Sequence, residues 1–218
     1  MKILSLKSGL LSVAGAAFVA LVSIAPAHSA IISIGGPQSS AGSFASLIAA
    51  PSSVEDDTTT NTGQQGFNEA QGVLLGSALA VDGGSIAAGT RVDSHMIFLN
   101  SQGNADISHY QVTWGFSGNI LGVMSDSSGN LEAASNALLG AAGTTYPGGF
   151  AARGLEGGGD NYSFLGSAMT LGMHVTEPGD WIRVVTVSAV PLPAALPLYG
   201  AGIAVLGFLG WRRRKNAA

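Results

Sequence analysis

One stretch near the middle of the chain indicates the fold class most directly: Tyr110-Gln111-Val112-Thr113-Trp114-Gly115-Phe116. Its large apolar side chains alternate with polar or small ones, which is the period of two expected of a half-buried β-strand. The alternation places Tyr110 on the same face as Val112, Trp114 and Phe116. We therefore expect a strand here with one face in a hydrophobic core.

Several segments around this stretch also have the composition of short strands, and Gly, Asn, Asp and Ser separate them. The clearest are residues 91–99, 120–124, 168–175 and 181–187. Residues 100–104 are rich in turn formers. The strand that ends at Leu99 is therefore expected to form a hairpin with the strand that contains Tyr110.

One segment has helical rather than strand spacing. Residues 131–139 carry apolar side chains at the helical period, Gly140 follows as a stop signal, and Asn130 could cap the first turn. Residues 51–66 are polar and are expected to form a long loop. The sequence therefore predicts a mainly β protein, a small β sandwich or jelly roll with one short helix.

The composition agrees with such a body and excludes several kinds of site. Of 218 residues, 46% are hydrophobic, only 10% are charged and 32 are Gly. These proportions fit a glycine-punctuated β domain better than a helical bundle. Because the chain has no Cys, disulfides, cysteine-ligated zinc and cysteine nucleophiles are excluded together.

The charges are distributed unevenly along the chain. Six of the nine basic residues lie in the two terminal segments, whereas all 13 acidic residues lie between Glu55 and Asp180. The middle therefore carries three basic against 13 acidic residues, a net charge of −10. Such a segment repels phosphate backbones, so no nucleic-acid partner is expected. The acidic middle could keep an exported protein soluble or attract cations.

The first 30 residues have the pattern of a secretory signal peptide. Lys2 and Lys7 precede an uncharged run over residues 8–25, and Pro26 and small residues follow. The lysines would stay in the cytoplasm while the apolar run inserts as a helix. Cleavage is expected after Ser29 or after Ala30, and an uncleaved anchor is the alternative.

The C-terminal residues have the pattern of a short membrane-spanning segment. Residues 184–211 carry no charge, and residues 194–211 are 18 in number, near the lower limit for a bilayer span. Three prolines rule out one continuous helix through the whole run, namely Pro191, Pro193 and Pro197. Four basic residues follow and place that end in the cytoplasm, namely Arg212, Arg213, Arg214 and Lys215. A permanent single-pass anchor is the alternative to a temporary one.

The order of these parts resembles a known sorting signal. The box Val190-Pro191-Leu192-Pro193-Ala194, an apolar helix and an arginine-rich end are similar to the VPLPA variant of the PEP-CTERM signal, over residues 190–218. The resemblance implies recognition by an exosortase, an integral-membrane cysteine protease or transpeptidase that cuts near the proline box. The recognition box would then comprise Val190, Pro191, Leu192, Pro193 and Ala194, and residues 212–215 would be the retention signal. Leu192 stands where the parent signal has Glu, which leaves the exosortase subtype open.

Three segments are therefore expected: a signal peptide over residues 1–30, a secreted glycine-rich β domain over 31–189, and a sorting signal over 190–218. A signal helix and a transmembrane helix would flank the body. By resemblance, the processed protein would reach the cell surface or the extracellular matrix of a Gram-negative bacterium. Its membrane contact would be transient, and an extracellular polysaccharide is a candidate partner.

No residues in the middle of the sequence form a recognisable catalytic, metal or cofactor motif. The histidines at positions 95, 109 and 174 lack the spacing of a zinc motif, although His95 and His109 could face each other across the expected hairpin. The runs Asp82-Gly83-Gly84 and Gly157-Gly158-Gly159 lack the strand-to-helix context of a phosphate loop. Both are expected to be turns.

The acidic residues leave two chemical alternatives open. Residues 126–132, with Asp126 and Glu132, and residues 156–160, with Glu156 and Asp160, offer the oxygen ligands that calcium prefers. Their spacing departs from that of an EF-hand, and ordinary turn chemistry explains them as well. Paired carboxylates for glycoside hydrolysis could come from four residues that the sequence does not rank, namely Glu69, Glu132, Glu156 and Glu177.

The function expected from these observations is non-catalytic. We expect an exported structural or adhesive protein that is processed by an exosortase, with no catalytic residue, no metal site and no cofactor assigned. The alternative is a carbohydrate- or calcium-binding module, which an exposed Tyr, Trp or Phe beside a carboxylate loop would favour. A secreted hydrolase is the third possibility, and it would require two facing carboxylates in a cleft.

Overall fold

The computed structural model describes residues 28–188, 200, 202–204, 206 and 207 of the chain. Residues 28–188 belong to one compact unit, which is called the body below. The six described residues beyond the body are helical. Within the part of the chain that is described, no helix is both long enough and apolar enough to span a membrane.

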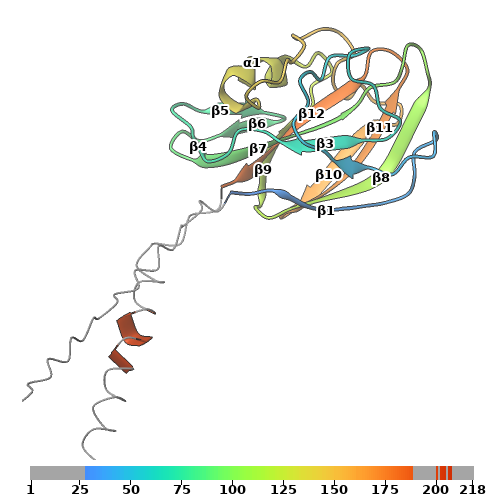
Figure 1. Ribbon diagram of the computed structural model, residues 1–218. Coiled ribbons are helices and arrows are strands. Elements are labelled where there is room, and N and C mark those ends of the chain that lie inside the picture. Colours follow the sequence, from blue (N-terminus) through green and yellow to red (C-terminus); the bar gives the residue numbers. More distant parts are fainter. Residues whose placement is uncertain (1–27, 189–199, 201, 205, 208–218) are drawn as a thin grey trace, which may run out of the picture. The chain divides into compact units, whose positions relative to one another are not determined.

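The body consists mainly of short strands, with one helix (Figure 1). In chain order its elements are β1 (Ile31–Gly35), β2 (Ser46–Leu47), β3 (Gln65–Asn68), β4 (Val73–Leu74), β5 (Leu79–Val81), β6 (Gly84–Ile86), β7 (Arg91–Leu99), β8 (Ile107–Phe116), β9 (Ile120–Met124), α1 (Asn130–Leu139), β10 (Asn161–Leu165), β11 (Ala168–Val175) and β12 (Asp180–Val187). Strands β7, β9 and β11 have the bounds expected from the sequence, and β12 begins one residue earlier than expected.

Most of the strands lie in two sheets. The first sheet has the strand order β1-β8-β11-β10, and the second has the order β2-β3-β7-β12-β9, with β4 also paired to β7. The short pair of β2 and β3 is parallel, and the other pairs in the two sheets are antiparallel. Strands β5 and β6 form a separate hairpin, whose turn lies at Asp82 and Gly83, where the sequence predicts one.

The main hydrophobic core contains side chains from both sheets. Val112, Trp114 and Phe116 of β8 share one buried cluster with Ile182 and Val184 of β12. Burial of side chains of this size contributes about 1.5–3 kcal/mol each relative to exposure. The mainly β class that the alternating stretch predicts is therefore confirmed.

Tyr110 departs from the predicted alternation. It is 38% exposed, whereas the neighbouring His109 is fully buried. The register of β8 against β11 shifts at this point, so that Tyr110 and Gln111 together oppose the single residue Gly172. Such a β-bulge inserts one extra residue and reverses which side chains face the core. Gln111 adopts a φ of 57° at the bulge.

The second sheet is buried on both faces. Val92 of β7 and Val185 of β12 pack against Leu139 of α1, on the face away from the first sheet. Beside them, Trp181 packs against Val54 from the predicted loop over residues 51–66. That segment is therefore partly buried, and its last two residues begin β3. Because both faces are covered, β7 and β12 are buried along nearly their whole length.

The expected hairpin between residues 91–99 and the strand that contains Tyr110 is wrong. Strand β7 belongs to the second sheet and β8 to the first, so the connection crosses from one sheet to the other. The buried side-chain amide of Asn100 donates to the carbonyls of Val54, at 3.1 Å, and Thr59, at 2.9 Å. Asn100 therefore anchors the segment that contains Val54 and Thr59, and it does not close a hairpin.

Helix α1 lies where the sequence predicts a helix, but its N-cap residue is Gly129, and the side chain of Asp126 supplies the capping hydrogen bonds. Asn130 is the first helical residue rather than the cap. The carboxylate of Asp126 accepts hydrogen bonds from the backbone N–H groups of Asn130, at 2.9 Å, and Leu131, at 3.0 Å. The first backbone N–H groups of a helix have no acceptor within the helix, and the Asp126 carboxylate accepts hydrogen bonds from two of them here. Gly140 ends the helix, as expected.

Strand β1 begins and strand β12 ends beside the same turn, residues 117–119 (Figure 1). The hydroxyl oxygen of Ser29, just before β1, accepts a hydrogen bond from the N–H of Gly118 at 3.0 Å. The N–H of Val187, the last residue of β12, donates to the carbonyl of Asn119 at 2.8 Å. The chain therefore enters and leaves the body at the same place.

Candidate functional site

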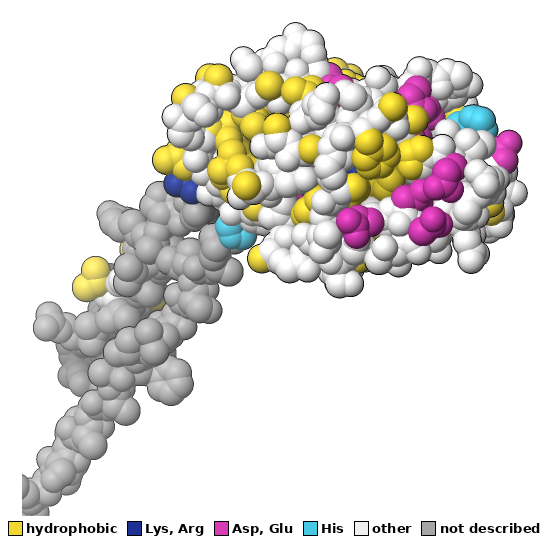
Figure 2. All heavy atoms as spheres, turned by 90° about the horizontal axis from the view of Figure 1, so that it is seen from above, with side chains coloured by type: hydrophobic (Ala, Val, Ile, Leu, Met, Phe, Trp, Pro, Cys, Tyr) yellow, Lys and Arg dark blue, Asp and Glu magenta, His cyan; other side chains and the backbone are white. Residues whose placement is uncertain are grey.

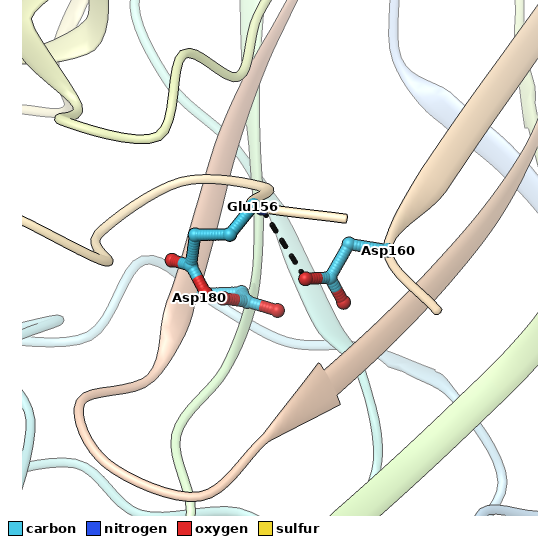
Figure 3. A group of neighbouring side chains, drawn as sticks. All are labelled: Glu156, Asp160 and Asp180. Atoms are coloured by element: carbon cyan, nitrogen blue, oxygen red, sulfur yellow. Dashed lines mark hydrogen bonds between the residues drawn. The ribbon is translucent and has the colours of Figure 1, made fainter. Parts of the chain in front are cut away.

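Three carboxylates from two separate segments of the body converge at one point, and they are called the acidic cluster below. Glu156 and Asp160 flank the loop before β10, and Asp180 is the first residue of β12. One oxygen from each residue can be chosen so that all three lie within 4.8 Å of one another. Figure 3 shows the three side chains pointing toward one another. The sequence indicates Glu156 and Asp160 as a possible cation loop, but it does not connect them with Asp180.

The loop between the first two carboxylates is shaped by glycine. Gly157 and Gly158 adopt φ values of 100° and 76°, in the region that glycine enters without steric cost. This conformation turns the chain back, so that the backbone N–H of Glu156 donates to Asp160 Oδ2 at 3.3 Å (Figure 3). The backbone N–H of His174 in β11 donates to Asp160 Oδ1 at 2.7 Å. Asp160 is therefore held in place from two sides.

Asp180 occupies the inner side of the acidic cluster. Its residue surface is only 2% exposed, and its Oδ2 atom has no hydrogen-bond partner within the described part of the chain. Glu156 is exposed and Asp160 is partly exposed. The cluster is thus a small site that opens to solvent on the Glu156 side and ends at a buried carboxylate.

The electrostatics of the cluster favour uptake of positive charge. Burial raises the pKa of Asp180 to about 9, and the nearby carboxylates of Asp160 and Glu156 add to that rise. Burial also raises the pKa of Asp160 and of Glu156. Among the described residues, no side-chain nitrogen of Lys, Arg or His lies within 4.0 Å of these carboxylates. At neutral pH the raised pKa of Asp180 therefore favours the presence of a proton or another cation at this carboxylate.

The surface of the body is acidic as a whole. Of its 13 acidic residues, four are buried, namely Glu69, Asp93, Glu132 and Asp180. Arg153 and Arg183 are also fully buried, so Arg91 is the one basic residue that is exposed in the body. Figure 2 shows most of the visible acidic side chains gathered over one part of the face, away from the small dark-blue area of Lys and Arg side chains. A cation approaching this face meets a favourable field.

A second site is a groove of about 640 Å³ lined by parts of residues 41–46, 60–65 and 102–107. Phe44 lines it and is 64% exposed. Gln65, Gln102 and Asp106 also line it, so an aromatic face lies among amide and carboxylate groups. Phe44 lies in a stretch of small residues without periodicity, and no sequence signal identifies it as a binding residue.

The candidate histidines are not brought together. The Nδ1 atom of His95 lies 2.8 Å from Asn68 Oδ1, and its Nε2 atom lies 3.1 Å from Thr186 Oγ1. His109 accepts a hydrogen bond from the N–H of Gln64 at 2.9 Å. The two histidines lie on strands of different sheets, so the idea that they face each other across a hairpin is wrong. Each one satisfies polar groups inside the body instead.

The other acidic residues considered from the sequence have structural partners. Asp126 caps α1, and Glu132 is buried and paired with Arg153. Glu69 is buried and paired with Arg183. The loop at residues 126–132 is therefore not a free set of oxygen ligands. Glu177 is exposed and is not part of the acidic cluster.

The expected sorting residues lie outside the described residues. These are Val190, Pro191, Leu192, Pro193 and Ala194 of the box and Arg212, Arg213, Arg214 and Lys215 of the basic end. A scan against protein-family models finds no match, and searches of curated proteins and of solved structures find no similar chain.

Proposed function

We propose that this chain is an exported surface protein whose body is displayed outside a Gram-negative cell after an exosortase has processed its C-terminal tail. The observation that best supports the proposal is the meeting of Ala30 and Val187 at the turn of residues 117–119, where the N–H of Ser117 donates to the carbonyl of Ala30 at 3.0 Å and the N–H of Val187 donates to the carbonyl of Asn119 at 2.8 Å. Ala30 stays in the mature protein when the signal peptide is cleaved after Ser29. The expected signal junction and the expected proline box thus join the body at the same place. A body attached in this way has its remaining surface free for contacts.

The position of β12 fits cleavage near the proline box. The strand ends at Val187, and the box begins three residues later, at Val190. Cleavage in or after the box would therefore leave every strand of the body intact. A box with two prolines cannot form a regular helix, and an extended segment suits a protease groove.

We further propose that the body is a β sandwich with a structural or adhesive, non-catalytic role. The two sheets share one buried core cluster, which supports a sandwich. A glycosidase needs two carboxyl groups that face the substrate across a cleft. In the acidic cluster Asp180 is buried, so it cannot face a substrate in this way. This burial favours ion binding over a hydrolytic pair.

Intact-mass measurement of the protein from a producing strain tests the sorting proposal. In the presence of the exosortase, the mature mass should lack most of residues 195–218, whereas a strain without the exosortase should retain them. Replacing both Pro191 and Pro193 with Ala should also block processing, while the matched variant Pro197→Ala, outside the box, should be processed normally. A tail that stays on the chain in every strain would establish a permanent anchor instead.

The groove supports a second candidate function, the binding of a neutral oligosaccharide. Sugar rings present apolar C–H faces and many hydroxyls, and Phe44 with Gln65, Gln102 and Asp106 offers an exposed ring beside hydrogen-bonding groups. None of the described residues that line the groove is Lys, Arg or His, and Asp106 is acidic, so an anionic sugar would be repelled. A partner of this kind agrees with the extracellular polysaccharide expected from the tail.

A further inference from the structure

We propose that Glu156, Asp160 and Asp180 bind one calcium ion. The proposal goes beyond sorting and surface display and depends on neither. It rests on the position of the three carboxylates, which bring one oxygen each within 4.8 Å of the others although they come from two separate chain segments. Figure 3 shows that all three point into the same small volume.

The buried oxygen of Asp180 is the independent observation that points to a ligand. Asp180 is 2% exposed and its Oδ2 atom has no partner in the described part of the chain. A buried polar atom without a partner is costly, and a buried charge is costlier still unless it is paired or coordinates a metal. Since no basic side chain of the described residues reaches the cluster, a bound cation would satisfy this oxygen.

The donor set favours calcium over other metals. All three side chains supply oxygen, whereas zinc and copper prefer nitrogen or sulfur ligands. His174 adds no nitrogen ligand, because its Nε2 atom lies 2.9 Å from Asp106 Oδ1 and only its backbone N–H contacts Asp160. Three converging carboxylates suit calcium, which takes about 6–8 oxygens in flexible geometry, better than magnesium, which keeps several waters and is usually bound through one or two carboxylates.

The remaining ligands would be water. Calcium takes about 6–8 oxygens, and carboxylates bind through one or two oxygens each. Glu156 is exposed, so solvent can reach the ion from that side and complete its coordination. A site with water ligands and one exposed carboxylate is expected to bind in the range of extracellular calcium modules, with a Kd of about 10⁻⁴–10⁻³ M.

The ion would connect the two sheets. The loop of Glu156 and Asp160 leads into β10 of the first sheet, while Asp180 begins β12 of the second sheet. Binding to the folded body and not to the unfolded chain stabilises the fold by mass action. Calcium would therefore lock this end of the body in a medium that contains the ion.

Calorimetric titration and thermal unfolding test the proposal. The full-length chain, purified from an exporting host in mild detergent and stripped of metal with EDTA, is titrated with CaCl₂. We expect one ion per chain and a Tm that rises by about 5–10 °C at a calcium concentration about a hundredfold above Kd. MgCl₂ at the same concentration should raise the Tm less.

Two variants make the test specific. Asp180→Asn keeps the size of the side chain and should fold but lose the calcium response. Asp57→Asn removes an exposed carboxylate elsewhere, at a φ of 58° that Asn tolerates, and should respond like the wild type. If Asp180→Asn does not fold, Glu156→Gln at the exposed side serves instead and should weaken binding at least tenfold.

Three results would overturn the proposal. The first is the absence of both heat and Tm shift up to about 10 mM CaCl₂, ten times the weak end of the expected Kd range. The second is an unchanged response in Asp180→Asn or Glu156→Gln. The third is an equal loss in Asp57→Asn, which would mean that calcium binds the acidic surface in general.

Discussion

Arg183 of β12 and Glu69, the residue after β3, form a two-pronged ion pair inside the body. The Nε and Nη2 atoms of Arg183 each lie 2.7 Å from a different carboxylate oxygen of Glu69, and both side chains are fully buried. Arg183 also donates to the carbonyl of Glu132, at 2.8 Å, and to the hydroxyl of Ser135, at 2.6 Å, in α1. One arginine therefore holds the helix, the second sheet and the segment after β3 together.

Replacing Glu69 with Gln should destabilise the body strongly. The variant leaves Arg183 charged and buried, with the carboxylate of Glu132 at 3.4 Å as its nearest remaining acidic group. Breaking a buried ion pair on one side costs about 3–5 kcal/mol. Urea unfolding of the full chain should show this as a lower midpoint, while the exposed control Glu177→Gln should leave the midpoint unchanged. Equal midpoints for wild type and Glu69→Gln would mean that the pair contributes little.

Gly129→Ala should destabilise more than Gly143→Ala. Both glycines have positive φ, 61° and 84°, so an alanine costs about 1–2 kcal/mol at either place. At Gly143 the added methyl meets open space, whereas at Gly129 it collides with the side chain of Arg153. Arg153 is fully buried and pairs with Glu132, and its guanidinium carbon lies 4.8 Å from the centre of the Trp181 ring. The Arg153 side chain therefore has little room to move. Thermal unfolding measures the difference, and equal Tm losses would rule out the collision.

His95 should make the stability of the body depend on pH. Burial lowers its pKa to about 4, against the opposing effect of Glu69 and Asp93; its ring nitrogens face Asn68 and Thr186. The unfolded chain therefore binds a proton near pH 6.5 that the folded chain does not take up until about pH 4. This contribution to stability is complete above pH 6.5 and is lost as pH falls toward 4, by roughly 3 kcal/mol.

The variant His95→Gln measures that contribution, because Gln cannot titrate. Wild type should lose more unfolding free energy than His95→Gln between pH 7 and pH 4, and the difference between the two curves removes the effect of the other groups. Chemical denaturation at several pH values gives both curves. Parallel curves would show that His95 is protonated equally in the folded and unfolded chain.

Phe44→Ala should weaken binding of a neutral oligosaccharide to the groove. The ring is 64% exposed at the groove, so its loss removes an apolar platform without opening the core. A loss of about 1.4 kcal/mol corresponds to a tenfold weaker Kd. Calorimetry with neutral hexose oligosaccharides measures this, with the exposed Phe164→Ala on β10, which does not line the groove, as the matched control. The groove function is rejected if no such sugar binds or if both variants bind equally.

Much of the local structure follows from neighbouring residues. The bounds of β7, β9 and β11, the single helix and its end at Gly140 agree with the sequence pattern. Periodicity and stop signals depend on residues close together in the chain, so they can be read without knowing the fold. The same holds for the acidic middle and the basic ends, which are matters of composition.

The bulge at Gln111 shows where local patterns fail. One inserted residue turns Tyr110 outward and His109 inward, and nothing in the alternation marks the position. The bulge depends on how β8 pairs with β11, a strand more than 50 residues away along the chain. Likewise, the turn formers after Leu99 do not reveal that β7 and β8 belong to different sheets.

The meeting of Asp180 with Glu156 and Asp160, and the pairing of Arg183 with Glu69, are consequences of the tertiary structure alone. Neighbouring letters were enough for the class of fold, the extent of most long strands and the contrast in charge between body and ends, because each of these arises from residues in local contact. The packing of distant strands decides the partner of each carboxylate. Some carboxylates then lie beside an arginine, and others lie beside another carboxylate. Burial makes an unpaired charge costly. Glu69 is buried beside an arginine, whereas Asp180 is buried beside two other carboxylates. This difference in partners distinguishes a structural acid from the acidic cluster.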